Sequence, residues 1–356
     1  MEEASVKLLP LNIDLETKPV LKALSQAHRL LGELKGAAKG MPNENILIHT
    51  LSLQEAKDSS EVESIVTTHD ELYRANIDRT QSEQTAATKE VKDYREALYE
   101  GYRQVQQHGL ITSSSIRRIQ SILEGNDAGF RSQAGTTLQN MYGEVVYMPP
   151  QSREEIERLM ANLEQFINEA SLSDLDPLVK MAIIHHQFES IHPFYDGNGR
   201  TGRIVNVLYL VQQGLLDLPI LYLSGYIVRN KSEYYRLLQA VREGGEWEAW
   251  TLFILEGVST IAGKTIERID RIAKLMQTFK QECRPVLDKG YSHDLLNLLF
   301  SYPYTKVEFI ADELKVNRKT ASKYLKQLTD AGILDMQKTG RTNYYINTRL
   351  VDILVH

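Results

Sequence analysis

The sequence predicts a mainly α-helical fold with a helical core, one short β-hairpin and a C-terminal winged helix-turn-helix. Through most of the chain, apolar residues recur every three or four positions, which is the period of an amphipathic helix. Over residues 130–148, glycines flank short β-prone pieces, and this pattern indicates a hairpin. Residues 291–356 read helix, helix, turn, helix and then two β-prone pieces around Gly340, which is typical of a winged helix-turn-helix.

Length and composition predict an intracellular, multidomain globular protein. At 356 residues the chain is too long for one compact core, and its 42% hydrophobic and 25% charged content is ordinary for a globular protein. The net charge of −6 argues against a protein that mainly coats nucleic acid. Cys283 is the single cysteine, so an intramolecular disulfide and a cysteine-rich zinc site are excluded.

The location that the sequence predicts is cytoplasmic. The first five residues are acidic and no apolar run follows them, so we expect no secretory signal. No stretch approaches the ~20 apolar residues that a membrane span needs, so we expect no contact with membranes.

Helical periodicity and polar interruptions predict four parts along the chain. Helices are expected over 20–39, 44–78 with an interruption near Asp58, 152–169 and 176–191, and two helices are expected over 90–125, the second capped near Thr112. A polar stretch at 79–89 marks the first boundary. The predicted parts are an N-terminal helical region (1–88), a core (89–265), a connecting helix (266–290) and the winged helix (291–356).

A glycine-rich loop between two predicted helices is the strongest functional signal. Apolar residues at helical spacing lead up to Ile191, Pro193 ends that helix, and helical periodicity resumes at Ile204. The loop therefore opens onto a helix N-terminus, where unpaired backbone N–H groups and the helix dipole attract anions.

The residue types in this loop suit the transfer of a phosphorus centre to an acceptor. Glycines let the backbone approach a phosphate, and arginines add positive charge with forked donors. An aspartate suits a hard cation such as Mg²⁺, and a histidine can take a proton near neutral pH. These residues are His192, Asp196, Gly197, Gly199, Arg200 and Arg203.

Three other interpretations compete with this one. Gly197, Gly199 and Gly202 match a dinucleotide fingerprint with Asp217 twenty residues further on, but that motif should follow a buried strand rather than a helix. A P-loop would need Lys-Ser/Thr where Arg203-Ile204 stands. A purely structural turn explains poorly why a histidine, an aspartate and two arginines share twelve residues.

The loop resembles the signature of the Fic family, HxFx[D/E]GNGRxxR. Every specified position matches, from His192 through Phe194 and Asp196 to Arg203. The resemblance covers most of the chain, because an N-terminal associated region, a helical core and a C-terminal winged helix occur together in many bacterial members.

The resemblance implies protein adenylylation, in which a Tyr, Ser or Thr hydroxyl attacks the α-phosphate of ATP. His192 would be the general base, Asp196 the Mg²⁺ ligand, and Phe194 the anchor of the loop in the core. Arg203 would bind the γ-phosphate, and Tyr234 matches a position that lines the adenine pocket, although ordinary helix packing would also explain it. The expected nucleotide-binding residues are Gly197, Asn198, Gly199, Arg200, Thr201, Gly202, Arg203 and Tyr234.

Partners are implied by the hairpin at 130–148, which matches the family's flap. An exposed edge strand can hold a target segment by main-chain pairing. The target would be another protein or the enzyme itself, and relatives often form homodimers. A surface hairpin that only covers the core is the alternative.

An upstream segment resembles the family's inhibitory helix motif, [S/T]xxxE[G/N]. Ser59 and Glu63 fit, whereas Ser64 replaces glycine or asparagine. Its position before the loop would make the chain a class II member, in which Glu63 pairs with Arg203 and so removes a γ-phosphate ligand. The alternative is a glutamate on a solvated helix face.

Two further function classes stay open. The chain could transfer another nucleotide, or it could be a DNA-binding regulator whose Fic core senses nucleotide. Residues 291–356 carry nine Lys/Arg against seven Asp/Glu, so DNA binding and protein docking are equally supported. The basic residues of the expected recognition helix and wing are Arg318, Lys319, Lys323, Lys326, Lys338 and Arg341.

The remaining histidines and tryptophans point to packing rather than chemistry. His185 and His186 are adjacent, so they point apart on a helix and lack the i, i+4 spacing of a helical zinc site. Trp247 and Trp250 are expected to be core or rim aromatics. Gly199 stands where the kinase-like Doc branch has lysine, which argues against phosphorylation.

Overall fold

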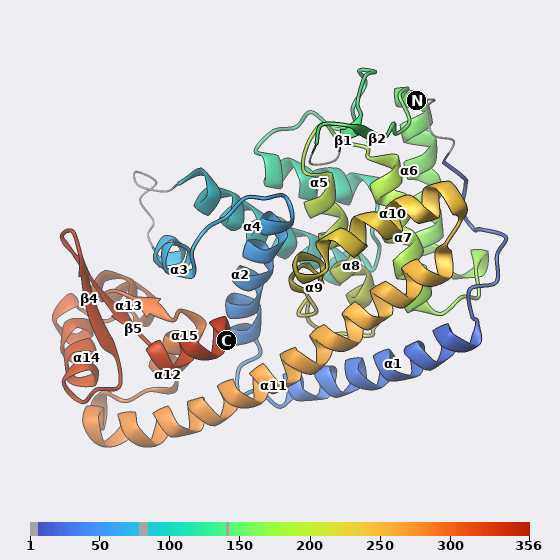
Figure 1. The fold of residues 1–356 in the computed structure, drawn as a ribbon. Helices are drawn as coiled ribbons and strands as arrows, with labels where there is room; N and C mark the ends of the chain where they lie inside the picture. Colours follow the sequence, from blue (N-terminus) through green and yellow to red (C-terminus); the bar gives the residue numbers. More distant parts are fainter. Residues whose placement is uncertain (1–5, 78–84, 140–141) are drawn as a thin grey trace. The chain divides into compact units, whose positions relative to one another are not determined.

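A computed structural model of the chain describes residues 6–77, 85–139 and 142–356 (Figure 1). It contains two compact units, each assembled from three separate stretches of sequence. The first unit comprises Met1–Lys35, Asp58–Ile65 and Asp93–Gly263, and the second comprises Gly36–Lys57, Val66–Lys92 and Lys264–His356. Among the described residues, no helix combines the length and apolar character needed to cross a membrane.

The first unit is helical except for one hairpin. Its own helices are α5 (Ser113–Glu124), α6 (Arg153–Asn168), α7 (Pro177–Ile191), α8 (Asn198–Gln212), α9 (Ser224–Arg229), α10 (Lys231–Gly244) and the short 3₁₀ helix η2 (Ala170–Leu172). Four longer helices contribute residues to both units: α1 (Lys18–Lys39), α2 (Asn45–Val62), α4 (Ala86–His108) and α11 (Trp247–Leu287).

Helix α7 is the centre of the first unit. Every residue from Leu178 to Ile191 is buried, as expected of a helix that is covered on all sides. It packs beside α6 and α8, and α5 packs on both α6 and α8. The indole of Trp250 on α11 is fully buried and donates a hydrogen bond to the carbonyl of Ala182 (2.8 Å). This rigid centre carries the glycine-rich loop, which joins α7 to α8.

The hairpin predicted over 130–148 is present but short. Strands β1 (Leu138–Gln139) and β2 (Val145–Tyr147) pair antiparallel, with Leu138 opposite Tyr147. The preceding backbone pairs elsewhere, because the N–H of Arg131 donates to the carbonyl of Pro193 (2.9 Å). The hairpin is therefore tied to the loop through its approach segment.

The C-terminal part of the second unit has the order of elements expected for a winged helix-turn-helix. Strands β4 and β5 form the hairpin predicted as the wing, with Gly340 at φ 58° in its turn, and β3 completes an antiparallel sheet of order β3-β5-β4. The elements are α12 (His293–Ser301), β3 (Tyr304–Thr305), α13 (Val307–Leu314), α14 (Arg318–Asp330), β4 (Asp335–Thr339), β5 (Thr342–Ile346) and α15 (Thr348–Val355). The short 3₁₀ helix η3 (Asp288–Gly290) precedes α12.

Helix α3 (His69–Ile77) packs on this sheet within the second unit. The ring of Tyr73 stacks on that of Tyr304 with centroids 5.5 Å apart, and the Tyr304 hydroxyl donates to Asp70 Oδ1 (2.7 Å). The second unit thus combines sequence from both ends of the chain.

Several predicted boundaries fall inside helices. The interruption expected near Asp58 lies further on, between the end of α2 at Val62 and the start of α3 at His69. The limit at 88 falls within α4 and that at 265 within α11, while part of the polar stretch 79–89 lies outside the described residues. The serines after Asp58 do not end α2, because Ser59 and Ser60 are buried by tertiary packing.

Candidate functional site

The loop begins with an abrupt end to α7 at the predicted base. His192 has a left-handed backbone (φ 49°), and its N–H donates to the carbonyl of Phe188 (3.0 Å). Arg131, fully buried, fixes this turn by donating from Nε to the carbonyl of His192 (2.8 Å). No sequence pattern singles out Arg131, because it lies 61 positions before His192, in the approach to the hairpin.

The next residues close the loop on itself. Asn198 Oδ1 accepts from the N–H of Phe194 (2.8 Å), and its Nδ2 donates to the Phe194 carbonyl (2.9 Å). The Phe194 ring is fully buried beside Phe130 and Phe188. Phe194 therefore anchors the loop in the core, and the side chain of Asn198 braces it.

The N-terminus of α8 is shaped to receive an anion. Gly197 is the N-cap residue with φ 75°, a backbone that glycine adopts readily, and it has no side chain of its own to cap the helix. The first-turn N–H groups and the helix dipole favour negative charge there. Asp196 Oδ1 accepts from the N–H of Gly197 (2.7 Å), just outside that turn.

His192 is neutral at physiological pH. Burial, reinforced by Arg131 and Arg242 and opposed by Asp196, lowers its pKa to about 3. Its Nδ1 is enclosed and has no hydrogen-bond partner among the described residues. A neutral imidazole nitrogen can accept a proton from an incoming hydroxyl.

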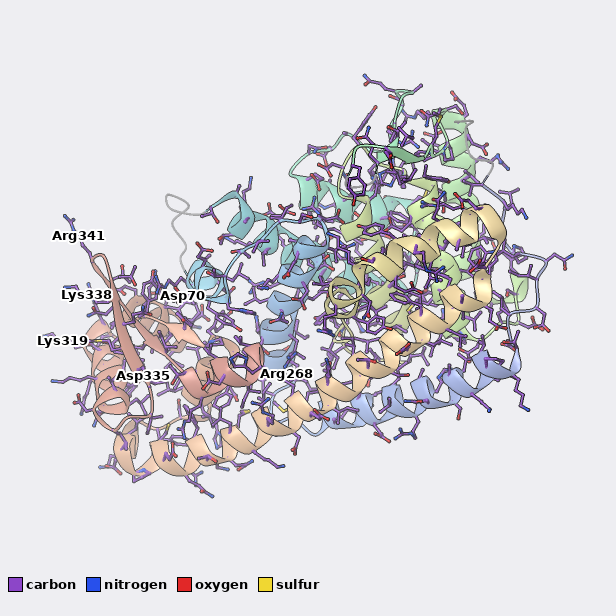
Figure 2. All side chains as sticks on the ribbon, in the orientation of Figure 1. Asp70, Arg268, Lys319, Asp335, Lys338 and Arg341 are labelled. Atoms are coloured by element: carbon purple, nitrogen blue, oxygen red, sulfur yellow. The ribbon has the colours of Figure 1, made fainter. Side chains whose placement is uncertain are left out.

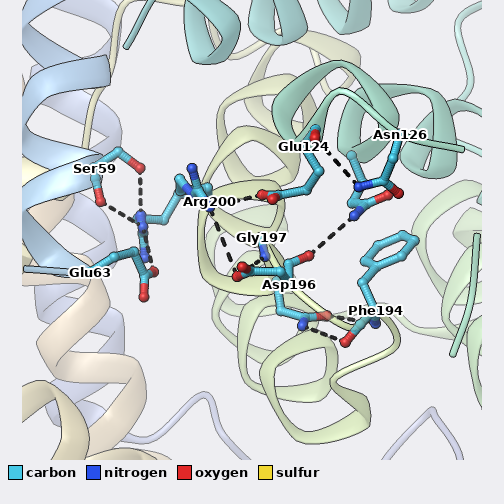
Figure 3. A network of polar contacts seen from close by, with 11 residues as sticks. Ser59, Glu63, Glu124, Asn126, Phe194, Asp196, Gly197 and Arg200 are labelled. Carbon is cyan, nitrogen blue, oxygen red and sulfur yellow. Dashed lines mark hydrogen bonds and ion pairs between the residues drawn. The ribbon is translucent and has the colours of Figure 1, made fainter. Parts of the chain in front are cut away.

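Arg203 is buried and held by the end of α2, as the inhibitory motif predicts. Its Nε donates to Ser59 Oγ (2.9 Å), and its Nη2 donates to the Ser59 carbonyl (2.9 Å) and to Glu63 Oε1 (2.9 Å). A side chain at Gly199 would collide with the same carboxylate oxygen. Figure 3 shows Ser59 and Glu63 together on one side of the loop. Despite burial, the nearby carboxylate of Glu63 raises the pKa of Arg203.

Arg200 has a carboxylate partner of its own on the opposite side of the loop. Its Nη2 donates to Glu124 Oε1 (2.8 Å), whereas Asp196 Oδ1 is 4.0 Å away (Figure 3). Glu124 is the last residue of α5, and a side chain at Gly197 would collide with it. Sequence reasoning missed Glu124, which belongs to no motif of the loop.

Two predicted nucleotide-binding residues face the interior. The side chain of Thr201 is fully buried, and its hydroxyl has no hydrogen-bond partner among the described residues. A Cβ on Gly202 would lie 2.9 Å from Glu189 Oε1 on α7. Glu189 is itself buried, which raises the pKa of its carboxyl to about 7 against the opposing effect of Arg203. Gly202 therefore permits close packing of α8 on α7.

Tyr234 lies in an aromatic cluster beneath the site. It is 2% exposed, and its hydroxyl is 2.9 Å from His185 Nε2. Its ring packs near those of Trp250 and Phe253. The neighbouring Tyr235 is 47% exposed, and the charges of Glu63 and Arg203 act on its hydroxyl. Tyr235 is the more accessible of the two aromatic rings.

The adjacent histidines are packing residues in this arrangement. His185 and His186 are both buried, and burial lowers the pKa of each to about 3. His186 Nε2 lies 3.2 Å from the carbonyl of Leu238 on α10. Trp250 is a core aromatic, whereas Trp247 packs edge-on against His186.

Strand β2 of the hairpin is fastened to the helical core. The Tyr147 hydroxyl donates to the carbonyl of Ser190 (2.9 Å), and the Arg242 guanidinium lies 3.8 Å from the centre of the Tyr147 ring. Gln239 Nε2 donates to the carbonyl of Val146 (3.1 Å). Within the described residues this sheet consists of two short strands, β1 and β2.

Solved structures share this fold. A Fic family protein from Desulfovibrio desulfuricans G20 matches with a TM-score of 0.59 and 17% identity, covering 95% of this chain and 97% of that one. A Fic domain containing signaling protein from Bacteroides thetaiotaomicron matches with a TM-score of 0.54 and 19% identity, covering 72% and 97%. At these identities the likeness concerns the fold alone.

Curated relatives match over shorter stretches. The protein adenylyltransferase fic-1 of Caenorhabditis briggsae is 28% identical over 138 residues, which are 39% of this chain and 25% of that protein. The probable protein adenylyltransferase aq_aa38 of Aquifex aeolicus is 41% identical over 70 residues, 20% and 19% of the two chains. The chain thus spans a quarter or less of the length of these relatives.

Family models cover most of the chain in sequence order. The Fic/DOC family N-terminal model matches residues 21–103, and the Fic/DOC family model matches 63–210, which includes the loop. The C-terminal domain of SoFic-like protein adenylyltransferases matches residues 275–350. With the loop geometry, the shared fold and all three models in agreement, the chain belongs to the Fic/DOC family.

Proposed function

We propose that this chain is a protein adenylyltransferase, which transfers AMP from ATP to a Tyr, Ser or Thr hydroxyl of a protein. The observation that carries the proposal is the neutral His192 beside the N-terminus of α8, with Arg200 and Arg203 on the first turns of that helix. The names of the curated relatives, which are protein adenylyltransferases, support the same chemistry.

The arrangement accounts for each step of the transfer. As the hydroxyl oxygen of the target attacks the α-phosphorus, its proton passes to Nε2 of His192. The bond between the α-phosphorus and the bridging oxygen breaks, and diphosphate leaves. Negative charge develops on the phosphates, where the amides of α8 and the guanidinium groups of Arg200 and Arg203 stabilise it.

Asp196 is suited to hold the Mg²⁺ ion that accompanies ATP. Its side chain is 81% exposed, and one carboxylate oxygen is used by the N–H of Gly197. Carboxylate oxygens are the ligands that Mg²⁺ prefers, and the bound ion would neutralise phosphate charge. The donor set fits, and Asp196 would bind the ion together with phosphate oxygens.

Glu63 is proposed to inhibit the enzyme. Its carboxylate bonds to Arg203 and lies directly over Gly199, in the first turn of α8. ATP placed there would lose Arg203 as a ligand for its terminal phosphate, and would meet a like charge. Activation would require Glu63 to move away from Arg203.

The target protein is proposed to bind along the hairpin by main-chain pairing. Such pairing positions a hydroxyl near His192 without requiring a particular side-chain sequence. A segment of a second copy of the chain could be held in the same way, which would result in self-modification.

DNA binding by the second unit is the second candidate function. The side chains of Lys319, Lys338 and Arg341 are exposed and point outward from α14 and from the β4–β5 hairpin (Figure 2). A gel-shift series at several salt concentrations tests this role. Sequence-specific binding with a steep salt dependence supports it, and absence of binding at low salt excludes it.

The reaction is tested with purified Glu63→Gly protein and ATP labelled at one phosphate. Label at the α-phosphate should appear on protein, whereas label at the γ-phosphate should not. Incorporation of the γ-label would mean phosphate transfer, and incorporation of neither label would sink the proposal. CTP, GTP and UTP, offered in the same assay, test whether the nucleotide is adenine-specific.

A further inference from the structure

Helix α5 contacts both ends of the glycine-rich turn through two residues one helical turn apart. Gln120 Nε2 donates to the carbonyl of Asp196 (3.2 Å), and Glu124 Oε1 accepts from Arg200 (2.8 Å). Residues four apart lie on the same face of a helix. One face of α5 therefore holds the residue that precedes the turn and the arginine that follows it.

The contact between Glu124 and Arg200 is largely shielded from solvent. The side chain of Glu124 is 14% exposed and that of Arg200 is 7% exposed. Glu63, which pairs with Arg203, is 36% exposed. Breaking a buried ion pair leaves an uncompensated charge, so such a pair persists unless another ion replaces one partner. Gly197 allows Glu124 to approach the turn closely, because any Cβ at this position would collide with the Glu124 side chain.

The end of α5 also holds Glu124 in place. Gly125 follows it with φ 64°, a left-handed conformation that glycine adopts without strain. At the other end, the helix begins with a capping box between Thr112 and Ser115. Glu124 is thus carried by a helix with two well-formed ends.

We propose that Glu124 is a positioning residue, which holds the guanidinium of Arg200 in the orientation that receives the diphosphate part of ATP. The proposal rests on the adenylyltransferase function proposed above. A guanidinium is planar and has five N–H donors, so it can bind a carboxylate on one edge and a phosphate on another. Glu124 would stay in place through the reaction, unlike Glu63.

The test compares Glu124→Gln with its parent in the Glu63→Gly background, by the steady-state rate of AMP transfer over a range of MgATP concentrations. Glutamine keeps the shape but weakens the hold on Arg200. We expect kcat/KM for ATP to fall by roughly 10- to 100-fold, mainly through kcat. A guanidinium group whose orientation is not fixed stabilises the transition state less.

Two controls separate positioning from a general loss of stability. Glu155→Gln removes a surface carboxylate that pairs with Arg158 at 2.7 Å, and it should leave kcat/KM within about twofold of the parent. Adding Glu124→Gln to Arg200→Ala should cost no more than about a further twofold, because the two residues act as one unit. Thermal unfolding of every variant is recorded alongside.

The proposal is supported if Glu124→Gln lowers the rate of AMP transfer and this loss depends on the presence of Arg200. The proposal is overturned by unchanged transfer, or by a loss that adds fully to that of Arg200→Ala. It is also overturned by a rise in transfer, which would make Glu124 a competitor of ATP. If Glu124→Gln does not fold, Glu124→Asp is judged by the same criteria. An inactive Glu63→Gly parent would instead overturn the function itself, and the positioning role with it.

Discussion

The two arginines of the loop each meet a carboxylate, yet the two pairs differ in how firmly they are held. The Nη2-to-Oε1 distances are nearly equal, 2.9 Å for Arg203 with Glu63 and 2.8 Å for Arg200 with Glu124. Glu63 is 36% exposed, whereas Glu124 is 14% exposed. We propose that the more exposed pair, Arg203 with Glu63, can be released, whereas the more buried carboxylate of Glu124 is a fixed support for Arg200.

The helix ends that carry the two glutamates differ in the same sense. After Glu63, Ser64 adopts φ 68°, and the N–H of Ile65 donates to the carbonyl of Ser60 (3.0 Å), as in a Schellman motif. Most residues with a Cβ are strained in this left-handed conformation by about 1 kcal/mol, whereas glycine and, less often, asparagine adopt it readily. The corresponding position after Glu124 is Gly125, which carries no such strain. The family's preference for Gly or Asn after the inhibitory glutamate has this physical reason.

The largest expected effect would come from removing His192, the proposed general base. In the Glu63→Gly background, His192→Ala should reduce AMP transfer by about 10²- to 10⁴-fold, because the hydroxyl loses its proton acceptor. Binding of MgATP, followed by calorimetry, should be little changed. The exposed His108 on α4 provides the control, and transfer that survived the loss of His192 would mean that both pairs flank something other than a catalytic site.

The next effect concerns the releasable pair itself. Glu63→Gly should raise self-labelling by α-labelled ATP by roughly 5- to 150-fold, the range of typical coupling free energies, because Arg203 becomes available to the nucleotide. Glu63→Gln should raise it in the same direction by removing only the charge. Equal labelling of parent and variants would mean that Glu63 is a surface glutamate with no inhibitory role.

A smaller pair of effects exchanges the residues that end the two helices. Ser64→Gly should stabilise the inhibited form by about 1 kcal/mol and so lower basal transfer about fivefold. Gly125→Ser should destabilise the protein by a similar amount and lower transfer through Glu124. Urea unfolding and basal labelling report both, and a rise in transfer for Ser64→Gly would contradict the assigned role of the α2 end.

The smallest expected effect is a nearly constant rate on acidification. Burial lowers the pKa of His192 to about 3, so the base stays neutral as the pH falls from 8 to 5.5. The stability that this buried neutral imidazole contributes is full above pH 6.5 and declines as the pH falls from 6.5 towards 3, because the unfolded chain takes up a proton that the folded chain does not. Transfer by Glu63→Gly should therefore show no bend near pH 6.5, the usual histidine pKa. A bend near pH 7 that vanished in Glu189→Gln would belong to Glu189 instead.

The sequence was sufficient wherever the relevant pattern is local. The loop, the helix that follows it and the hairpin are short-range features, set by glycines, a proline and hydrophobic periodicity. The pairing of Glu63 with Arg203 could be predicted only because a family motif links these two positions, which are 140 residues apart.

Other parts of the site depend on contacts that no local pattern records. Arg131 reaches His192 across 61 residues, and Glu124 reaches Arg200 across 76. The expected helix break near Asp58 failed for the same reason, since Ser59 is satisfied by Arg203 rather than by a turn. Thr201 and Gly202 share the motif with the proposed phosphate ligands, but Thr201 is buried and Gly202 packs against α7.

The proposed reaction is tested most directly by a crystal structure of the Glu63→Gly protein with Mg²⁺ and a non-hydrolysable ATP analogue. We expect phosphates at the N-terminus of α8, the terminal phosphate on Arg203, the adjacent phosphate on Arg200 with Glu124 still in place, and the α-phosphorus facing His192 Nε2. A nucleotide bound elsewhere, or a His192 ring turned away from the α-phosphorus, would contradict it.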